Sequence, residues 1–564
     1  MKYLLSILLI ANLFSNTDEP SQINALGDWD PIPIFTVGES INNYFPPGKL
    51  DGIGALQIDT SLVRLLINHE LSDDDGYLYY LSNGTGLRGS RVSFFDLNKN
   101  TFELMDANLA YHTIIDRMGE IVTSAYQINE YEAGAFDGLD RLCSSGFYHG
   151  GELGLIDDIY LTGEENDNGQ AFALDPHNNI LYTIPVLGRC EFENLALLEL
   201  ENPNLIAIVI GADTPGAPLF LYVGENDSES DNFLSRNGLS LNQGKLFALV
   251  INNANNPIDF SGTGSERSGF FQELDYYRPD LAGVQGYDSL GFASQELQYQ
   301  LAEQLGAFTF SRPEDLSKNP NSSTEFVFTS TGRSSSFNGV DKWGTTYIIN
   351  LDFIDIENND IQAYINIIYD GDDAGNNQFN NSDFGLRSPD NLDWSDNGMI
   401  YIQEDAAYSL FGNVSDIEAS VWELNPENGI LNRIGIIDRN AIPSNQYDDD
   451  PDDFGEWESS GILDVSNEFS FTNMTLLVLD VMAASLDGGP INQYNLEQGG
   501  QLLLLKKQNY LLGDVNLDGI INILDIIATV NFVLSNEYNV LADLNDDSII
   551  NVLDIIELVN IIMN

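Results

Sequence analysis

Between about residues 24 and 508 the chain is a succession of strand-length apolar runs, and this pattern limits its fold more than any other feature. Runs such as NLIAIVIGA (204–212), LFLYVGEN (219–226) and TEFVFTST (324–331) are bounded by Gly, Asn, Asp or Pro, as β-strands usually are. Only GFASQELQYQLAEQL (291–305) has helical spacing. We therefore predict an all-β large domain. A β-propeller is favoured over a sandwich or barrel, because no linker-like stretch divides the region and blades can be added around one channel.

The charge balance excludes some partners and suggests others. The chain has 22 Lys and Arg against 87 Asp and Glu, a formal net charge of −65 at pH 7, while 43% of its residues are hydrophobic and can build a core. Binding to nucleic acid or to an anionic membrane surface is excluded, because no basic stretch is available to meet the phosphates. A folded chain of this charge must tolerate its self-repulsion or neutralise it with cations. We therefore expect bound metal, with calcium as the default.

The N-terminus has the pattern of a secretory signal peptide, which we place at residues 1–16. Met1 and Lys2 precede the apolar run YLLSILLIANLF (3–14), after which the sequence becomes polar. A membrane-spanning helix needs about 20 apolar residues, and no later segment approaches that length. The alternative is a buried first helix of the domain. We expect a secreted, extracellular or cell-surface protein without a membrane span.

Two acidic loops near the C-terminus have the same spacing. In GDVNLDGIINILD (513–525) and ADLNDDSIINVLD (542–554), oxygen-bearing side chains fall at positions 1, 3, 5, 9 and 12 of a twelve-residue loop, as a hard cation such as Ca²⁺ requires. Gly519 stands at the sharp turn of the first loop and Ser548 at that of the second. The candidate calcium ligands are Asp514, Asn516, Asp518, Asn522 and Asp525 in the first loop, and Asp543, Asn545, Asp547, Asn551 and Asp554 in the second.

Each loop runs into an apolar segment that we predict to be helical, 523–534 and 552–563. This paired arrangement over residues 511–564 resembles a type I dockerin domain. Asp at position 12 and a helix on only one side of each loop distinguish it from an EF-hand. The resemblance implies calcium-dependent folding. It also implies a cohesin-like protein or a cell-surface component as partner, whose specificity stays open.

Acidic residues recur where predicted strands of the large domain end. In a propeller, alternate strand ends converge on the channel mouth, where carboxylates would repel one another unless cations lay between them. The alternative is a set of solvated loop positions, because acidic residues are abundant throughout the chain. The residues concerned are Glu70, Glu164, Glu165, Glu225, Glu404 and Asp405.

Nine short segments spread over the large domain carry a family resemblance. They are LINHEL (66–71), RLCSSG (141–146), YLTGEE (160–165), LGRCEFENLAL (187–197), SRPEDL (311–316), PDNLDW (389–394), IQED (402–405), ESSGILD (458–464) and EQGGQLLLL (497–505). In this order they resemble the PhoX alkaline phosphatases and their relatives, and the resemblance covers residues 24–508. It implies a propeller that carries a cluster of calcium and iron ions and hydrolyses phosphate esters, with one Cys and several carboxylates as ligands.

The resemblance also implies a set of site residues, with no catalytic residue separate from the metal ligands. Cys143 is then the candidate thiolate ligand of iron. A disulfide between Cys143 and Cys190, which an exported protein could form, would exclude that iron site, and an inert buried thiol is a third possibility. The candidate oxygen ligands are Glu164 or Glu165, Glu193, Glu314, Asp390 and Glu404, with Glu70 as a weaker member.

The expected chemistry explains why such residues would be needed. A phosphate ester dianion is repelled by so acidic a chain unless clustered cations reverse the local sign. Carboxylates suit Ca²⁺, whereas one soft thiolate suits a transition metal such as iron. Arg141, Arg312 and Arg387 lie near the motifs, and they can either hold a substrate oxygen or pair with the ligand carboxylates.

Two other functions remain open at this point. One is a non-catalytic, calcium-stabilised propeller for adhesion or binding, and the other is a polysaccharide-degrading enzyme, suggested by the dockerin resemblance alone. The four histidines show no HExxH spacing, and the chain has neither a GxSxG elbow before a helix nor a GxxxxGK[ST] loop. A secreted, metal-dependent phosphoester hydrolase tethered through a dockerin domain is the favoured hypothesis.

Overall fold

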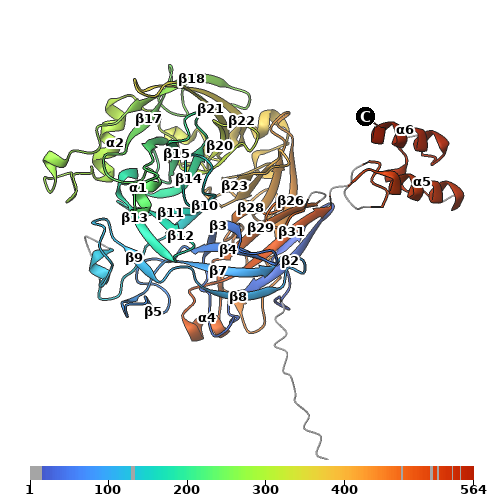
Figure 1. The fold of residues 1–564 in the computed structure, drawn as a ribbon, viewed down its shortest axis with the longest axis horizontal. Helices are drawn as coiled ribbons and strands as arrows, with labels where there is room; N and C mark the ends of the chain where they lie inside the picture. The colour runs from blue at the N-terminus through green and yellow to red at the C-terminus, as the bar shows by residue number, and fades with distance from the viewer. Residues whose placement is uncertain are drawn as a thin grey trace, which may run out of the picture.

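Antiparallel β-sheets form most of the protein. The computed structural model describes residues 16–128, 134–471, 474–508, 512–516, 520–535, 538–545 and 548–563. The predicted signal peptide therefore lies outside the described residues except for Asn16. In Figure 1 the sheets form one body, and two C-terminal helices lie apart from it. The prediction of a β-rich large domain is confirmed.

Five sheets build the β body, and the strands of each sheet are named in the order in which they pair. The first is β2 (Trp29–Thr36), β31 (Gly499–Gln508), β29 (Met474–Ala483) and β28 (Trp457–Asp464). The second is β3 (Leu50–Gln57), β4 (Leu62–His69), β7 (Arg91–Asn98) and β8 (Leu104–Leu109). The third is β10 (Leu142–Tyr148), β11 (Ile159–Glu164), β12 (Ala171–Asp175), β13 (Ile180–Ile184) and β9 (Thr113–Ile115).

The remaining sheets are larger or join distant parts of the chain. The nine-stranded sheet is β14 (Phe192–Leu198), β15 (Leu205–Ala212), β16 (Phe220–Glu225), β17 (Gly244–Ile251), β18 (Glu266–Glu273), β22 (Asp360–Asp370), β21 (Thr345–Asp355), β20 (Glu325–Ser330) and β19 (Pro313–Lys318). The fifth sheet is β1 (Ile23–Ala25), β26 (Leu431–Ile437), β25 (Ser420–Leu424), β24 (Ile400–Glu404) and β23 (Pro389–Trp394). Two short ladders pair β5 (Tyr79–Tyr80) with β6 (Gly86–Leu87) and β27 (Tyr447–Asp448) with β30 (Leu486–Asp487).

Six strands from these sheets contact one another in a continuous sequence. β3 contacts β10, β10 contacts β14, β14 contacts β19, β19 contacts β23, β23 contacts β28, and β28 contacts β3. We call them the inner strands. The nine-stranded sheet supplies two of them, β14 and β19, one at each edge. The first and last long strands, β2 and β31, pair in the sheet that contains β28, so the two ends of the β body are held together by main-chain hydrogen bonds.

The core lies between the sheets. All seven residues of β14 are buried, as are all but the first residue of β15 and of β29. Strands covered on both faces read as continuous apolar runs instead of an alternation, which is why NLIAIVIGA (204–212) was recognisable as a strand.

Helices are few in the β body. The helical prediction at 291–305 is confirmed by α2 (Gln295–Gln304), which begins after Ser294, whose hydroxyl accepts from the Leu297 N–H. The other helices there are α1 (Phe233–Arg236), α3 (Ala374–Asn377) and α4 (Gly489–Tyr494).

The C-terminal region contains α5 (Ile523–Ser535) and α6 (Val552–Met563), which confirm the two predicted helices and contact each other. Among the described residues, no helix is both long and apolar enough to cross a membrane.

Candidate metal centre

Every inner strand has an irregularity in its pairing at a corresponding place. In five of them two residues oppose a single residue of the next strand, so each is a β-bulge. A bulge breaks the normal alternation and re-aims a side chain, which is common beside active sites. In β28 the shift falls at Gly461, which has no side chain to present. The five bulge pairs are Asp51-Gly52, Cys143-Ser144, Glu193-Asn194, Glu314-Asp315 and Asp390-Asn391.

A second set of acidic residues comes from the neighbouring strands. β4, β11, β15 and β24 each pair with an inner strand, and in each case the residue directly after the strand is acidic. These residues are Glu70, Glu165, Asp213 and Asp405.

The two sets meet in one cluster. Ligand atoms within 4.8 Å of one another define three overlapping groups: Asp51, Glu70 and Cys143; Cys143, Glu165 and Glu193; and Glu193, Glu314 and Asp390. The Cys143 sulfur lies 3.5 Å from Asp51 Oδ2 and 3.4 Å from Glu193 Oε1. Because Cys143 and Glu193 each belong to two groups, the groups are continuous. We call these seven residues the central cluster.

Burial dominates the electrostatics of the cluster. It raises the pKa of Asp51 to about 8, with the charge of Glu70 as the next cause. Burial likewise raises the pKa values of Glu193, Glu314 and Asp390 well above the ordinary range, and neighbouring carboxylates raise them further. The cluster therefore holds more negative charge than its own surroundings stabilise.

Two arginines compensate part of this charge. Arg141 Nη2 lies 2.6 Å from both Glu70 and Glu165. Arg312 donates to both oxygens of Asp213, at 2.8 and 2.7 Å, and lies 3.2 Å from Glu314 Oε1. Burial would raise the pKa of Asp213, but Arg312 outweighs it and lowers that pKa.

The donor set fits a mixture of hard and softer cations. The central cluster and Asp213 together contribute seven carboxylates, whereas Arg141 and Arg312 contribute two positive charges. Buried carboxylates in such excess require cations or protons. Carboxylate oxygens suit Ca²⁺, and the single thiol suits a transition metal such as iron. The types of donor present, one thiol and several carboxylates, are therefore those that the family resemblance implies.

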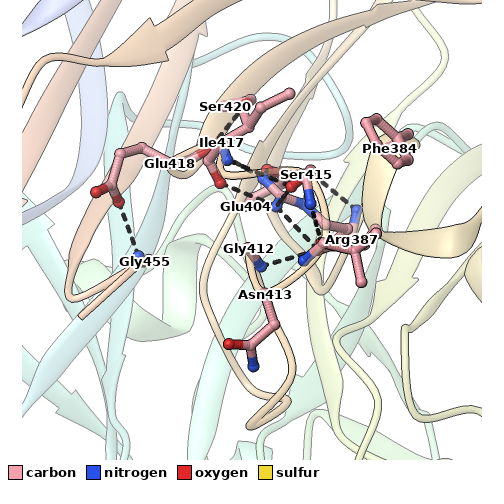
Figure 2. A network of polar contacts seen from close by, with 12 residues as sticks. Phe384, Arg387, Glu404, Gly412, Asn413, Ser415, Ile417, Glu418, Ser420 and Gly455 are labelled. Carbon is pink, nitrogen blue, oxygen red and sulfur yellow. Dashed lines mark hydrogen bonds and ion pairs between the residues drawn. The ribbon is translucent and has the colours of Figure 1, made fainter. Parts of the chain in front are cut away.

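Glu404 and Arg387 form a different structure, so two predictions are corrected. The Arg387 side chain is fully buried and lies 2.7 Å from Glu404 through Nη2, and the Arg387 main-chain N–H also donates to Glu404 at 2.8 Å. Trp422 Nε1 donates to the same carboxylate at 3.0 Å. Figure 2 shows this pair with the loop residues Gly412 and Ser415 around it. Glu404 is thus paired away from the central cluster, and Arg387 is not accessible to a substrate.

Two further acids lie outside the central cluster. Glu164 accepts from the main-chain N–H groups of Asp140 and Gln170, both at 3.2 Å, so of the adjacent pair it is Glu165 that joins the cluster. Glu225, at the end of β16, is exposed.

Both cysteines are free thiols, so the disulfide alternative does not apply to this structure. Cys190 is fully buried in an apolar core, among residues such as Leu187 and Phe192. Cys143 alone lies with carboxylates.

One residue of the central cluster and several acids at its edge were absent from the predicted ligands. Asp51, in the cluster, and Asp213, at its edge, lie outside the motifs that carried the prediction, and Asp405 was predicted only as a strand-end acid. Glu458 was part of a motif but was not singled out. Its pKa is raised by burial first and by the charge of Asp405 next, which places it beside the cluster. A usable signal was present: in each bulge pair, an acid or Cys precedes a small or polar residue inside a strand.

The C-terminal loops have a consistent local geometry. Asp525 accepts from the N–H groups of Asn516 and Asn522, at 3.1 and 2.8 Å, and Asp554 makes the equivalent contacts with Asn545 and Asn551. Both aspartates, like Asp514 and Asp543, are buried. Ser548 adopts a left-handed φ of 64° at the turn position. The candidate ligands Asp518 and Asp547, and Gly519, lie outside the described residues.

The fold and the central cluster together define a class: a multi-sheet β protein whose innermost strands present carboxylates and one thiol at a single place. Comparison with known families identifies it further. The model of the family described as alkaline phosphatase PhoX matches residues 126–433, more than half of the chain, and the chain belongs to this family. It is accordingly a phosphoric ester hydrolase.

Solved structures support the fold. Pseudomonas fluorescens PhoX in complex with vanadate, a transition state analogue, aligns with a TM-score of 0.58 and 15% identity, covering 87% of this chain and 97% of that one. A Synechocystis apocarotenoid oxygenase mutant covers 84% of this chain and 93% of its own at 10% identity, but its TM-score of 0.29 is too low to indicate a shared fold. No curated protein sequence matches the chain.

Proposed function

We propose that this protein is an exported, metal-dependent phosphatase whose central cluster holds calcium and iron. The observation that carries the proposal is the position of Cys143, the one thiol among seven buried carboxylates, within 3.5 Å of both Asp51 and Glu193. One soft donor among many hard ones is what a mixed calcium–iron centre requires. Membership of the phosphatase family favours this function over a non-catalytic module or a polysaccharide-degrading enzyme.

The proposed ligands are the residues of the central cluster. Cys143 would bind iron, and the carboxylates would bind both metals. Asp213, Asp405 and Glu458 are further oxygen donors at its edge. Bound cations would supply the positive charge that a phosphate ester dianion needs in so acidic a chain. Because bulges fix five of the cluster's donors and strand ends fix Glu70 and Glu165, the set is pre-organised and little movement is needed to fill it.

Arg141 and Arg312 are the chain's own candidates for holding the substrate. Each uses Nε and Nη2 for contacts within the protein, and no contact of either Nη1 occurs among the described residues. The Arg141 side chain is 38% exposed and that of Arg312 is 20% exposed. We infer that each Nη1 donates to a phosphoryl oxygen while Nη2 keeps its carboxylate in position.

The sheets are proposed to be the blades of a propeller with six inner strands. The unbroken sequence of contacts from β3 through β28 and back to β3 supports this architecture, as does the pairing of β2 with β31 at the point where the ends meet. In a propeller the bulges of all inner strands face one channel. The central cluster would then lie at one mouth of that channel.

Export and tethering complete the proposal. The apolar segment at 3–14 supports secretion. The repeated loops and α5 and α6 support a calcium-binding dockerin domain over 511–564, with a cohesin-like or cell-surface partner. Deleting residues 509–564 should leave phosphate release unchanged and abolish calcium binding by the C-terminal loops, measured by calorimetry. Loss of phosphatase activity on deletion would contradict independent domains.

The central test uses the two thiols as a matched pair. Purified full-length protein loaded with calcium and iron should release phosphate from p-nitrophenyl phosphate, and mass spectrometry should find both metals bound. Cys143→Ser should lose iron and activity, whereas Cys190→Ala, in the apolar core, should keep both. An active protein that binds no iron, or a Cys143→Ser variant with full activity, would overturn the proposed centre.

A further inference from the structure

A large groove without charged residues lies away from the central cluster, beside the second sheet. Its volume is about 670 Å³, and it is formed by the loop before β3, by β5, the middle of β7, the end of β8, the turn at Asn179, and the end of α4. β5, β8 and α4 lie near one another at the lower edge of Figure 1. We call it the aromatic groove, because eight of its thirteen lining residues are Tyr or Phe.

The groove's lack of charge is unusual for this chain. Asp and Glu make up 87 of 564 residues, yet none of the thirteen lining residues is Asp, Glu, Lys or Arg. An anionic ligand would find no counter-charge there, and a cationic one no carboxylate. The other lining residues are three Asn, one His and one Leu, so the groove offers ring faces and neutral hydrogen-bonding groups.

The inner aromatic residues are held by the protein, whereas the outer ones are not. The Tyr79 and Tyr111 hydroxyls hydrogen-bond to each other at 2.9 Å, and both side chains are buried. By contrast, Tyr80 is 63% exposed and Tyr494 is 37% exposed. The Tyr494 ring stacks on Phe45 with centroids 4.0 Å apart, which makes a supported flat surface.

Hydrogen-bonding groups surround these rings. Within the described part of the chain, the side-chain amides of Asn43 and Asn179 and the hydroxyls of Tyr80 and Tyr494 form no hydrogen bonds. His112 is exposed at the same groove. Polar groups without internal partners at the edge of aromatic surfaces are suited to a ligand that is apolar on one face and rich in hydroxyls at its edge.

We propose that the aromatic groove binds a neutral carbohydrate. A pyranose ring has a flat C–H face that packs on an aromatic ring, and its hydroxyls match the amides and phenols at the rim. A proline-rich peptide also favours aromatic grooves, but it offers few groups for two unpartnered amides and two free phenols. The proposal is independent of the phosphatase centre, because the groove and the central cluster share no residue.

Calorimetry with the full-length protein tests this directly. The probes are neutral tetrasaccharides of β-1,4-linked glucose, xylose and mannose and of α-1,4-linked glucose, together with a proline-rich peptide. We expect at least one sugar to bind with a dissociation constant of about 1 mM or tighter. Tyr494→Ala and Tyr80→Ala should each weaken it about tenfold or more. Asn43→Ala should weaken it by a smaller factor.

The control is Tyr364→Ala, a tyrosine of β22 that is 58% exposed on a different sheet. It should leave sugar binding unchanged, and all variants should keep phosphate release, which shows that they are folded. The proposal is overturned if no sugar binds, if the peptide binds in their place, or if Tyr364→Ala weakens sugar binding as much as Tyr494→Ala does.

Discussion

The central cluster and the Arg387–Glu404 pair are two ways of burying carboxylates in one protein. Glu404 is fully buried, and its charge is met by a guanidinium, a main-chain N–H and an indole N–H. Asp383, beside Arg387, accepts from the N–H groups of Gly412, Val414 and Ser415. In the central cluster, by contrast, carboxylates mainly face one another and a thiol.

On the proposed function, the difference separates acids that hold the structure together from acids that bind metal. Where a carboxylate holds a loop, the chain supplies each oxygen with a donor, and the pKa of Asp383 is lowered although burial opposes this. Where a carboxylate is proposed to bind metal, it has few hydrogen-bond donors nearby and burial raises its pKa, as at Asp390. On the proposed function, we expect the buried acids with the fewest internal donors, such as Asp390, to bind metal most directly, whereas Glu70 and Glu165 share Arg141.

Removing the metals should have the largest effect, and of these two regions only the central cluster should respond. A chelator should abolish phosphate release, because the substrate would then face uncompensated carboxylates. Calcium and iron together should restore it. Phosphate release and metal content by mass spectrometry are the measurements, and full activity in protein proven free of metal would contradict the assigned role of the cluster.

Neutralising one acid in each region should separate metal binding from stability. Glu193→Gln, shared by two groups of the cluster, should lower phosphate release at least about 100-fold and reduce bound metal. Glu404→Gln should leave Arg387 buried with Asp383 but without its closer counter-charge, and should cost about 3–5 kcal/mol of unfolding free energy, with metal content retained.

The stability of both variants is measured by urea denaturation, and their metal content by metal analysis. Arg278→Gln, which removes an exposed pair with Asp280, is the control and should leave the urea midpoint unchanged. Metal loss from Glu404→Gln with unchanged stability would reverse the distinction between the two regions.

The two regions should also respond to pH with opposite signs. The pKa of Asp51 is raised from 3.8 to about 8, so metal-free native protein holds a proton that the unfolded chain has released. Its contribution to the stability of metal-free protein should fall as pH rises from about 4 to about 8. The lowered pKa of Asp383 works the other way, and its contribution is lost only as pH falls below about 4.

Urea midpoints of chelated and metal-loaded protein at about pH 5 and about pH 8 test this sign. The midpoint of chelated protein should decrease between them. That of loaded protein should not, because cations hold the ligands ionised and bind more tightly as protons leave. A chelated protein that gains stability over this range would contradict the raised pKa values.

The smallest effect is expected at Glu164. Glu164→Gln should keep activity within about twofold, because the hydrogen bonds described for this side chain, one at each oxygen, come from main-chain N–H groups and not from the central cluster. The amide oxygen can keep only one of these two hydrogen bonds, so the loss should fall on stability. Glu165→Gln, one residue on, should lose activity with the cluster. If both variants lost phosphate release equally, Glu164 would have to be counted among the metal ligands.

Two pairs of adjacent acids, 164–165 and 404–405, show what the sequence could predict about the site and what it could not. Strand ends were predictable, so the acids at 164–165 and 404–405 were recognised as candidates. Successive side chains on a strand point to opposite faces, and a shift of one position exchanges a ligand for a structural acid. Thus Glu165 and Asp405 face the cluster, whereas Glu164 and Glu404 do not.

Other features of the site and fold depend on contacts between residues far apart in the sequence, so no local pattern predicts them. Glu193 and Glu314 were found through family motifs, but Asp51 and Asp213 required the bulges and strand ends to be placed in space. The α2, α5 and α6 helices were predictable because their periodicity is local. The pairing of β2 with β31 joins residues more than 450 positions apart, so no local sequence pattern indicates it.

The five bulges have a consequence for how this family can vary. Each is defined by main-chain pairing, and its first residue supplies a side chain without taking part in the regular alternation. An exchange among Asp, Glu, Cys and His at one such position would therefore leave the main-chain pairing at the other four unchanged. Preference for one ion over another can be altered one strand at a time, so related enzymes can diverge in the ions they use while the scaffold stays the same.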